Sequence, residues 1–389
     1  MIELLYNDKT NKWYQKSTYQ FLYWGKEQKR LAPPPSSSIS SIITLDSNKN
    51  DAIRPIVGIL AGSNSSHHFS GNASIFKSIQ EEIRNTGGLS YVFTPNDVYR
   101  TFIKGYLYDP HSKKWTGYRF PYPNIVYNRI PDRKEEQAEK VALLFNLFSQ
   151  KGIPYFNRSF FQKDAIISHL NSNEKLTNFI PETERLTVTS LEEYLHTYPS
   201  VFCKPSSGSK GRGIFRVKNT STGYQYIDHD NAHSFASINK LHDYIHPLLL
   251  ENYMIQRDIQ LDTYENQTYD FRILVQKPLN SWNVTGIGIR AAQAGSLTTH
   301  VPRGGRIIPF HKLANHKDKA KLTRLAIMAA EVLEEETKMK ECSMDIGKDS
   351  DGQFWIFEAN SKPMRFDEPY IHRDYIQSLI ASFRTFSAF

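Results

Sequence analysis

The chain contains very little cysteine. Only two of its 389 residues, Cys203 and Cys342, carry a thiol, and both lie in apolar segments typical of buried strands. This scarcity excludes a disulfide framework and indicates reduced core residues of a cytoplasmic protein. The first twenty residues include no apolar segment of signal-peptide length, and no later apolar run is long enough to span a bilayer. We therefore expect a cytoplasmic protein with no membrane insertion.

Long runs of like charge are absent as well. The sequence has 48 Lys and Arg against 40 Asp and Glu, a formal net charge of +8, yet its cations are scattered along the chain. Nucleic-acid binding would require clustered cations interleaved with exposed aromatic residues, so we expect no nucleic-acid partner. Hydrophobic residues make up 39% of the chain and charged residues 23%, which indicates a folded protein with more than one hydrophobic core.

Apolar runs alternate with amphipathic segments in the region 51–158, which we expect to form one domain. The run IVGIL (56–60) is typical of a buried parallel strand, and the segment after it is typical of a helix stopped by two glycines. The run NIVYNRI (124–130) leads into a second helical segment, 134–151. Strands that alternate with helices predict an N-terminal α/β domain with a parallel sheet.

Two further regions flank this domain. Residues 1–50 mix aromatic and polar residues and include PPPSSSISS (33–41), which predicts a small β-rich leader and a Pro/Ser linker. Residues 159–389 contain many strand-like runs and helical segments at 163–170 and 317–339, which predicts an α+β domain.

Three glycines follow a lysine in the segment VFCKPSSGSKGRGIFRV (201–217). The glycines can expose backbone N–H groups to an anion, and two lysines supply positive charge. These residues are Lys204, Gly208, Lys210, Gly211 and Gly213. The spacing matches neither a P-loop nor a kinase glycine-rich loop. Because the loop lies between two strand-like runs, we expect a hairpin tip that closes over an anionic ligand, with an ordinary surface hairpin as the alternative.

A second hairpin is expected in ECSMDIGKDSDGQFWIFEANSKP (341–363), where two apolar strands flank an Asp-Gly turn. Strict alternation would place four side chains of the second strand on one face, namely Phe354, Ile356, Glu358 and Asn360. Asp345 would lie on the partner strand nearly opposite Glu358. Carboxylate and amide oxygens are hard ligands suited to Mg²⁺, so we predict a magnesium site at Asp345, Glu358 and Asn360, with solvated carboxylates as the alternative.

Two arginines lie inside strand-like runs, Arg272 in YDFRILVQK and Arg290 in VTGIGIRAA. An arginine in a half-buried strand needs an anionic partner, and its planar guanidinium suits a phosphate or a carboxylate. Structural salt bridges with Asp270 or Asp262 are the alternative. Because both strands lead toward the acidic hairpin, an anion site is favoured.

Together these motifs resemble the YheC/YheD family of ATP-grasp proteins, which are associated with spore coats in endospore-forming bacteria. The resemblance spans about residues 55–380 and rests on IVGIL, IVYNRI, YFNRSFFQK, FIPET, KPSSGSKGRGI, DFRILVQ, TGIGIR and FEANSKP. It implies an ATP-grasp fold for residues 159–389, with a lid around 200–255, after an α/β domain similar to a pre-ATP-grasp domain. The chain departs from related glutamate-ligating enzymes in LTTHVPRGG, where His300 stands at a position that resembles their Asn.

The resemblance also implies a role for each site residue. The phosphates and the adenine edge of ATP would contact Lys163 and Lys204. The adenine hinge would be Gln256, Arg257, Asp258 and Ile259. The mobile lid would include Ser207, Gly208, Ser209, Lys210, Gly211 and Gly213. Magnesium would be carried by Asp345, Glu358 and Asn360. The transferred phosphoryl group and the acyl phosphate would be stabilised by Arg272 and Arg290.

The motifs and the resemblance agree on a phosphoryl-transfer site that works by positioning and charge neutralisation. We therefore expect an ATP- and Mg²⁺-dependent ligase that joins a carboxylate to an amine, as small molecules or peptides, through an acyl phosphate. The alternative is a non-catalytic spore-coat-associated protein that retains an ATP-binding ATP-grasp fold. By resemblance, a cytoplasmic location would be combined with association with the spore coat.

Overall fold

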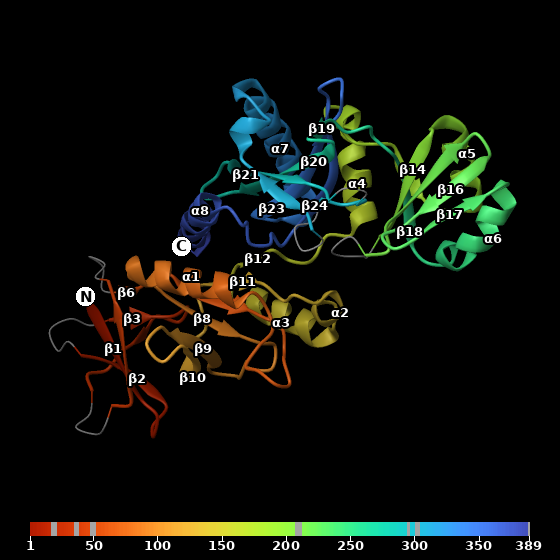
Figure 1. The fold of residues 1–389 in the computed structure, drawn as a ribbon. Helices are drawn as coiled ribbons and strands as arrows, with labels where there is room; N and C mark the ends of the chain where they lie inside the picture. The colour runs from red at the N-terminus through yellow and green to blue at the C-terminus, as the bar shows by residue number, and fades with distance from the viewer. Residues whose placement is uncertain are drawn as a thin grey trace.

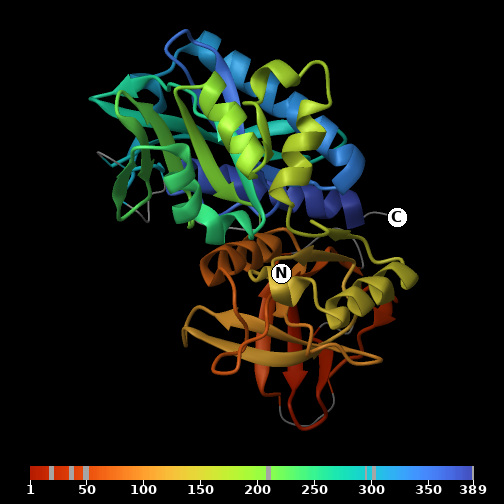
Figure 2. The same cartoon turned by 90° about the vertical axis from the view of Figure 1, so that its right-hand side faces the viewer.

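The computed structural model describes residues 1–16, 22–34, 39–46, 52–206, 212–293, 296–299 and 304–387. Figure 1 shows an N-terminal body, coloured red to yellow, below a larger body formed by the rest of the chain. The turned view in Figure 2 shows the same division, with the C-terminal helix α8 (Pro369–Ser387) close to the boundary. None of the helices within these ranges is long and apolar enough to cross a membrane.

The N-terminal body is built on a six-stranded sheet in the order β10-β9-β8-β7-β11-β12. Its strands are β7 (Ile56–Leu60), β8 (Leu89–Phe93), β9 (Ile103–Asp109), β10 (Lys114–Phe120), β11 (Ile125–Asn128) and β12 (Tyr155–Phe156). The four strands β8, β7, β11 and β12 are parallel, and β9 and β10 extend the sheet in antiparallel fashion. Every residue of β7 is buried, because alternate side chains join two different cores on the two faces of the sheet.

Helices cover both faces of this sheet. Helix α1 (Ala73–Asn85) begins at Asn72, whose side chain caps the backbone N–H of Ile75, and it packs on one face. Helix α3 (Glu139–Gln150) packs on the other face. The expected parallel sheet is thus present, with an antiparallel extension that the sequence pattern did not predict.

The single helix predicted over 134–151 is wrong, because the segment forms α2 (Arg133–Glu136) and α3, separated by Ala138 in an extended conformation. The carboxylate of Glu136 is buried and accepts hydrogen bonds from the side chain of Asn128 and the backbone N–H of Phe160, both at 2.7 Å. These bonds hold α2 against the segment that leads into the second body. Because the helix is interrupted at Ala138, α3 takes a different direction and packs against the sheet.

Two small sheets precede this domain. One has the order β2-β1-β5 and the other β4-β3-β6. Their strands are β1 (Ile2–Asn7), β2 (Lys12–Gln15), β3 (Tyr23–Trp24), β4 (Lys29–Arg30), β5 (Ser41–Leu45) and β6 (Ala52–Ile53). Trp13 stacks on Phe120 of β10 with ring centroids 5.5 Å apart, and Trp24 joins the same core. The β-rich leader is therefore packed into the N-terminal body.

The second body contains two antiparallel sheets. The first has the order β13-β18-β14-β15-β16-β17. Its strands are β13 (Thr183–Arg185), β14 (Ser200–Pro205), β15 (Phe215–Thr220), β16 (Gly223–Ile227), β17 (Ala232–Phe235) and β18 (Tyr253–Arg257). Helices α5 (Val188–Thr197) and α6 (Ile238–Leu249) share one core with this sheet. The opposite face of β14 and β18 is left open toward the second sheet.

The second sheet has the order β22-β21-β20-β23-β24, with β19 paired to β20. Its strands are β19 (Thr263–Tyr264), β20 (Gln267–Gln276), β21 (Asn283–Ala291), β22 (Arg306–Ile308), β23 (Glu341–Lys348) and β24 (Phe354–Asn360). Helices α4 (Lys163–Asn171) and α7 (His316–Thr337) pack against one core with this sheet, close to the ranges predicted for them. Within the described ranges, short 3-10 helices lie at Thr177–Phe179 and Phe310–Lys312.

Helix α8 joins the two bodies. Its buried residues share one hydrophobic core with α1, β7 and β11 of the N-terminal body. Beside this core, the buried carboxylate of Glu341 accepts a hydrogen bond from Tyr127 at 2.6 Å, and Tyr127 also bonds Tyr375 of α8 at 2.7 Å. The guanidinium of Arg129 lies 3.5 Å from Glu341. This buried network fixes the N-terminal body against β23 and so shapes the space between them.

Candidate functional site in the interdomain cleft

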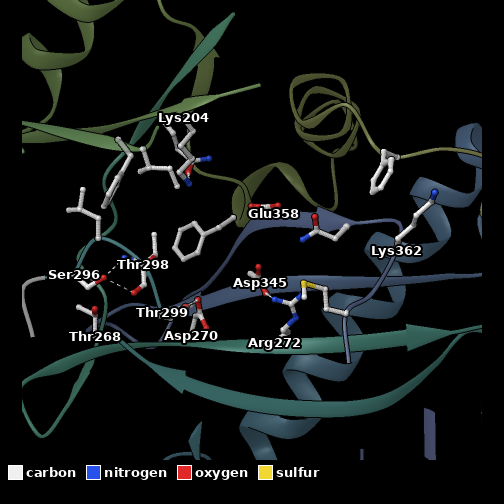
Figure 3. Close-up of a pocket in the computed structure, with 18 of the residues that line it drawn as sticks. Lys204, Thr268, Asp270, Arg272, Ser296, Thr298, Thr299, Asp345, Glu358 and Lys362 are labelled. Atoms are coloured by element: carbon white, nitrogen blue, oxygen red, sulfur yellow. Dashed lines mark hydrogen bonds and ion pairs between the residues drawn. The ribbon is translucent and has the colours of Figure 1, made fainter. Parts of the chain in front are cut away.

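A cleft with a cavity volume of about 1420 Å³ lies between the two sheets of the second body and the N-terminal body. Its walls are formed by residues of β14 and β18, by residues of β20, β23 and β24, and by the segments around residues 71–73 and 129–134. Figure 3 shows Lys204 on one side of this space and Glu358 and Asp345 on the other. The glycine hairpin and the acidic hairpin, which are far apart in sequence, therefore meet at one cleft.

Lys204 lies on β14 with its side chain turned toward the cleft, because its neighbours Val201 and Cys203 point into the core on the other face. Its ammonium group donates a hydrogen bond to Oε1 of Gln256 on β18 at 2.6 Å. Burial lowers the pKa of Lys204 to about 8, an effect opposed by the carboxylate of Glu358 and reinforced by Lys163. The amine is therefore poorly solvated and lacks a carboxylate partner within 4.0 Å among the described residues.

The glycine-rich segment is confirmed as a hairpin, because β14 and β15 are antiparallel neighbours. Their pairing extends from Cys203 opposite Phe215 to Ser200 opposite Lys218. Gly213 has a φ of +72°, a conformation that suits glycine. A Cβ atom there would lie 2.8 Å from the Tyr253 hydroxyl. The predicted lid residues Ser207, Gly208, Ser209, Lys210 and Gly211 lie outside the described residues, as does His300.

The four predicted hinge residues, Gln256, Arg257, Asp258 and Ile259, all line the cleft. Gln256 is held from two sides, since its Nε2 donates to the hydroxyl of Thr183 at 2.8 Å while its Oε1 accepts from Lys204. Asp258 accepts a hydrogen bond from the hydroxyl of Ser200 at 2.6 Å. Arg257 pairs with Glu182 at 3.4 Å. These contacts anchor the segment along one edge of the cleft.

At the centre of the acidic hairpin, Asp345 pairs directly with Glu358, which the sequence placed nearly opposite it. The predicted common face for Phe354, Ile356, Glu358 and Asn360 is wrong, however. A β-bulge between Asp345 and Ile346 inserts Phe357 as an extra residue, so the alternation changes phase. Phe354 and Ile356 point into the core together with Ala359, whereas Phe357, Glu358 and Asn360 line the cleft.

Cations lie beside both carboxylates. The ammonium of Lys163, at the start of α4, is 3.4 Å from Glu358. The guanidinium of Arg272, on β20, is 3.8 Å from Asp345. Arg272 is thus paired with Asp345 rather than with Asp270 or Asp262, the alternatives raised by the sequence.

Arg290 is buried on β21 and does not line the cleft among the described residues. Both Arg290 and Arg272 lie 5.9 Å from the ring centroid of Phe366. Burial and the nearby charge of Arg272 lower the pKa of Arg290. Arg290 pairs with Asp270 in the register of β20 and β21, so both arginines lie on the same face of the sheet, and Arg272 lines the cleft.

A family model described as YheC/D like ATP-grasp matches residues 152–385 of the chain. The chain belongs to this family. It is 29% identical over 349 residues to the endospore coat-associated protein YheD of Bacillus subtilis (strain 168), a match that covers 82% of this chain and 75% of that protein. It is 21% identical over 296 residues to the endospore coat-associated protein YheC of the same strain, covering 72% of this chain and 82% of YheC.

Among solved structures, this YheC/D-like protein is similar to the D-alanine-D-alanine ligase from Coxiella burnetii. The TM-score is 0.51 at 10% sequence identity, and the match covers 86% of this chain and 94% of the ligase. At that identity the likeness shows the fold alone. The predicted ATP-grasp fold is therefore confirmed, with mixed α/β architecture and several sheets.

The cleft of this YheC/D-like protein offers donors that fit Mg²⁺. Among the described residues, no group of three or more His, Cys, Asp or Glu side chains converges in a way that could hold a metal. Asp345, Glu358 and Asn360 instead combine two carboxylates with one amide oxygen on adjacent strands. Mg²⁺ is bound in proteins through one or two carboxylates together with substrate phosphates, so this smaller set fits that ion.

Several cleft residues were not predicted from the sequence. Arg129 and Arg133 come from the N-terminal body and reach the cleft only because that body docks against the second one. Lys362 follows β24 within the quoted motif FEANSKP, and burial lowers its pKa to about 8 even though Glu136 lies beside it. Asp270 lies two residues before Arg272 in the quoted motif DFRILVQ and also lines the cleft.

Proposed function

We propose that this protein is an ATP- and Mg²⁺-dependent ligase that joins a carboxylate to an amine, in small molecules or peptides, through an acyl phosphate. The observation that carries the proposal is that Lys204 and Glu358, from two sheets, line one cleft in an ATP-grasp fold. A buried ammonium group across from two carboxylates can hold a polyphosphate from both ends, since one side neutralises charge directly and the other suits a magnesium ion.

The roles proposed for the residues follow their positions. Lys163 and Lys204 would contact the phosphates of ATP, and the hinge of residues 256–259 would contact adenine, with Ser207, Gly208, Ser209, Lys210, Gly211 and Gly213 as the lid. Asp345, Glu358 and Asn360 would hold Mg²⁺, which when bound would neutralise charge on the transferred phosphoryl group. Arg272 would contact that group directly, and Arg290, on the neighbouring strand, would add positive charge at longer range.

The proposed reaction has two steps. A carboxylate oxygen of the acid attacks the γ-phosphorus of ATP, the bond to the β,γ-bridging oxygen breaks, and ADP leaves. A neutral amine then attacks the carbonyl carbon of the acyl phosphate. The C–N bond forms, the bond from carbon to the phosphate oxygen breaks, and the departing phosphate takes the proton that nitrogen loses. A closed lid would protect the acyl phosphate from water.

The names of the relatives suggest where the protein acts. YheD and YheC are both described as endospore coat-associated. We propose the same association for this chain, with synthesis in the cytoplasm.

ADP release is the test of the proposed ligase activity. The purified protein is incubated with ATP, Mg²⁺ and a panel of amino acids, peptides and peptidoglycan precursors. Lys204→Met and Glu358→Gln should each lower substrate-dependent ADP release by about 10²- to 10³-fold, because each removes a charge that stabilises the transferred group. The exposed residues Lys321 and Glu336 on α7 supply matched controls, Lys321→Met and Glu336→Gln, which should keep full activity.

A thermal melt separates catalysis from binding alone. Saturating Mg²⁺ and ADP at about one hundred times the Kd should stabilise the wild-type protein by about 2.7 kcal/mol. A stabilised protein that releases ADP with no member of the panel would favour the non-catalytic alternative. Unchanged ADP release from Lys204→Met or Glu358→Gln would refute the assignment of the site.

A further inference from the structure

One wall of the cleft is rich in hydroxyl groups and has a single carboxylate at its centre. Figure 3 shows Asp270 on β20 below Thr298 and Thr299, with Ser296 and Thr268 close by. All five residues line the cleft. Because Phe271, the next residue along β20, points into the core, Asp270 and Arg272 share the face that looks toward the cleft.

The bonding of Asp270 is incomplete. Its Oδ2 accepts a hydrogen bond from the hydroxyl of Thr299 at 2.5 Å. Its Oδ1 is buried and has no hydrogen-bond partner among the described residues, and no described cation lies within 4.0 Å of the carboxylate. The hydroxyl of Thr298 is likewise buried without a partner. Two unpartnered polar atoms on one wall of a cleft are costly in the absence of a ligand.

The charge on Asp270 is also poorly compensated. Asp270 lies near the negative charge of Asp345, and its neighbouring cations Arg290 and Arg272 are more than 4.0 Å from its carboxylate. A cationic ligand group beside Asp270 would compensate this charge. The group must also donate several hydrogen bonds, because the surrounding hydroxyls and the carboxylate can all accept them.

A primary ammonium group meets both requirements, since it carries one positive charge and three N–H donors. On the basis of the ligase function proposed above, we propose that Asp270, with Thr298 and Thr268, forms the subsite that recognises the amino group of the amine substrate. The substrate class is therefore a primary amine that is an ammonium ion in solution, such as an amino acid or the amino terminus of a peptide.

The location agrees with this role. Asp270 lies two residues from Arg272, and Arg272 pairs with Asp345 at 3.8 Å. An amine held by Asp270 would therefore wait beside the groups proposed to hold the transferred phosphoryl. Asp270 is a binding and positioning residue in this scheme, because it contacts the ammonium group before reaction. The bound ammonium releases one proton to water to give the neutral amine that attacks the acyl phosphate.

Calorimetric titration tests the subsite without knowledge of the acid. The wild-type protein, saturated with ADP and Mg²⁺, is titrated with a panel of amino-acid amides and with the N-acetyl form of each. At least one free amine should bind about 10- to 100-fold more tightly than its N-acetyl form, the range expected for a hydrogen bond to a charged group. Asp270→Asn should remove this preference and leave the affinity for ADP unchanged.

Two further variants keep the test decisive. Thr298→Val retains the carboxylate and should weaken amine binding by about 2- to 10-fold, as expected for one neutral hydrogen bond. Asp351→Asn, which alters an exposed carboxylate in the turn before β24, should change nothing. If Asp270→Asn does not fold, the Thr298→Val result decides between the outcomes.

Each failure has a distinct meaning. If the wild-type protein does not bind ADP with Mg²⁺, the proposed function is wrong. If it binds ADP but shows no preference for free amines, or if Thr298→Val leaves that preference intact, the amine subsite is wrong and the ligase proposal stands. If Asp270→Asn changes the Mg²⁺ dependence of ADP binding instead of amine affinity, the carboxylate belongs to the metal site and the inference is overturned.

Discussion

Nucleotide affinity should fall as the pH rises above about 8, because the ammonium group of Lys204 must be charged to bind a phosphate. Burial on β14 lowers the pKa of this group from 10.5 to about 8. Its hydrogen bond to the neutral side chain of Gln256 cannot offset the loss of solvation. A bound phosphate would restore the preference for the charged form.

The size of the effect follows from linkage between proton and nucleotide binding. In the free protein, the lowered pKa of Lys204 destabilises the folded state by about 3 kcal/mol at pH values below 8, and this cost disappears above the ordinary pKa. If the complex holds the lysine charged throughout, the Kd for ADP is nearly constant below the free pKa and increases tenfold per pH unit above it. Between about pH 7 and pH 9 the Kd should therefore rise about tenfold.

Isothermal titration calorimetry with ADP and saturating Mg²⁺ across this pH range is the direct measurement. Lys204→Met should bind ADP more weakly at low pH and show no rise in Kd between about pH 7 and pH 9, while Lys321→Met should behave like the wild type. A Kd that stays flat in the wild-type protein would refute the reasoning. So would a rise that persists in Lys204→Met, because another group would then be responsible.

Two substitutions test the packing that shapes the cleft. Glu341→Ala should lower the free energy of unfolding by about 3–5 kcal/mol, because it leaves Arg129 as a buried charge without its carboxylate and removes one hydrogen-bond partner of Tyr127. Gly286→Ala should cost about 1–3 kcal/mol, because its Cβ would lie 2.3 Å from Cγ2 of Ile371 on α8. Urea unfolding measures both changes.

Matched controls for these two variants lie on exposed parts of the chain. Glu336→Ala removes a carboxylate that is 58% exposed on α7 and should change the stability by less than about 0.5 kcal/mol. Gly117→Ala adds a methyl group at an exposed position of β10, where the nearest atom would be 3.2 Å away. Stability losses in the controls equal to those of Glu341→Ala and Gly286→Ala would contradict the packing argument.

Local pattern predicted those parts of the site that depend on neighbouring residues in sequence. The hairpin around Lys204 could be inferred because glycines lie between two apolar runs, and the pairing of β14 with β15 confirms it. That Asp345 lies near Glu358 could be inferred from the Asp-Gly turn, which pairs Lys348 with Phe354 and Ile346 with Ile356. Their direct pairing depends on the bulge, because that register would otherwise place Asp345 opposite Phe357. Both arginines were correctly placed inside strands, since an apolar run interrupted by one cation is a local signal.

The remaining features depend on contacts between distant segments. Arg133 reaches the cleft only after the N-terminal body docks, and that docking uses α8, which is more than 200 residues away from it in sequence. The break between α2 and α3 has the same origin, because Glu136 turns inward to meet Asn128, Phe160 and Lys362. The helical periodicity of one segment carries no information about a buried partner that comes from a distant part of the sequence.

The β-bulge at Phe357 explains how a core strand can also present a carboxylate. Ile356 points into the hydrophobic core, so regular alternation would send Glu358 into that core as well, at a large desolvation cost. The extra residue changes the phase and turns Glu358 into the cleft, where Lys163 lies 3.4 Å away, while Ala359 returns to the core. The strand thus keeps apolar anchors on both sides of the acidic residue, and these anchors hold the carboxylate opposite Asp345. Bulges are common beside active sites because they redirect a side chain without dissolving the sheet, and this bulge sets the geometry on which the proposed magnesium site depends.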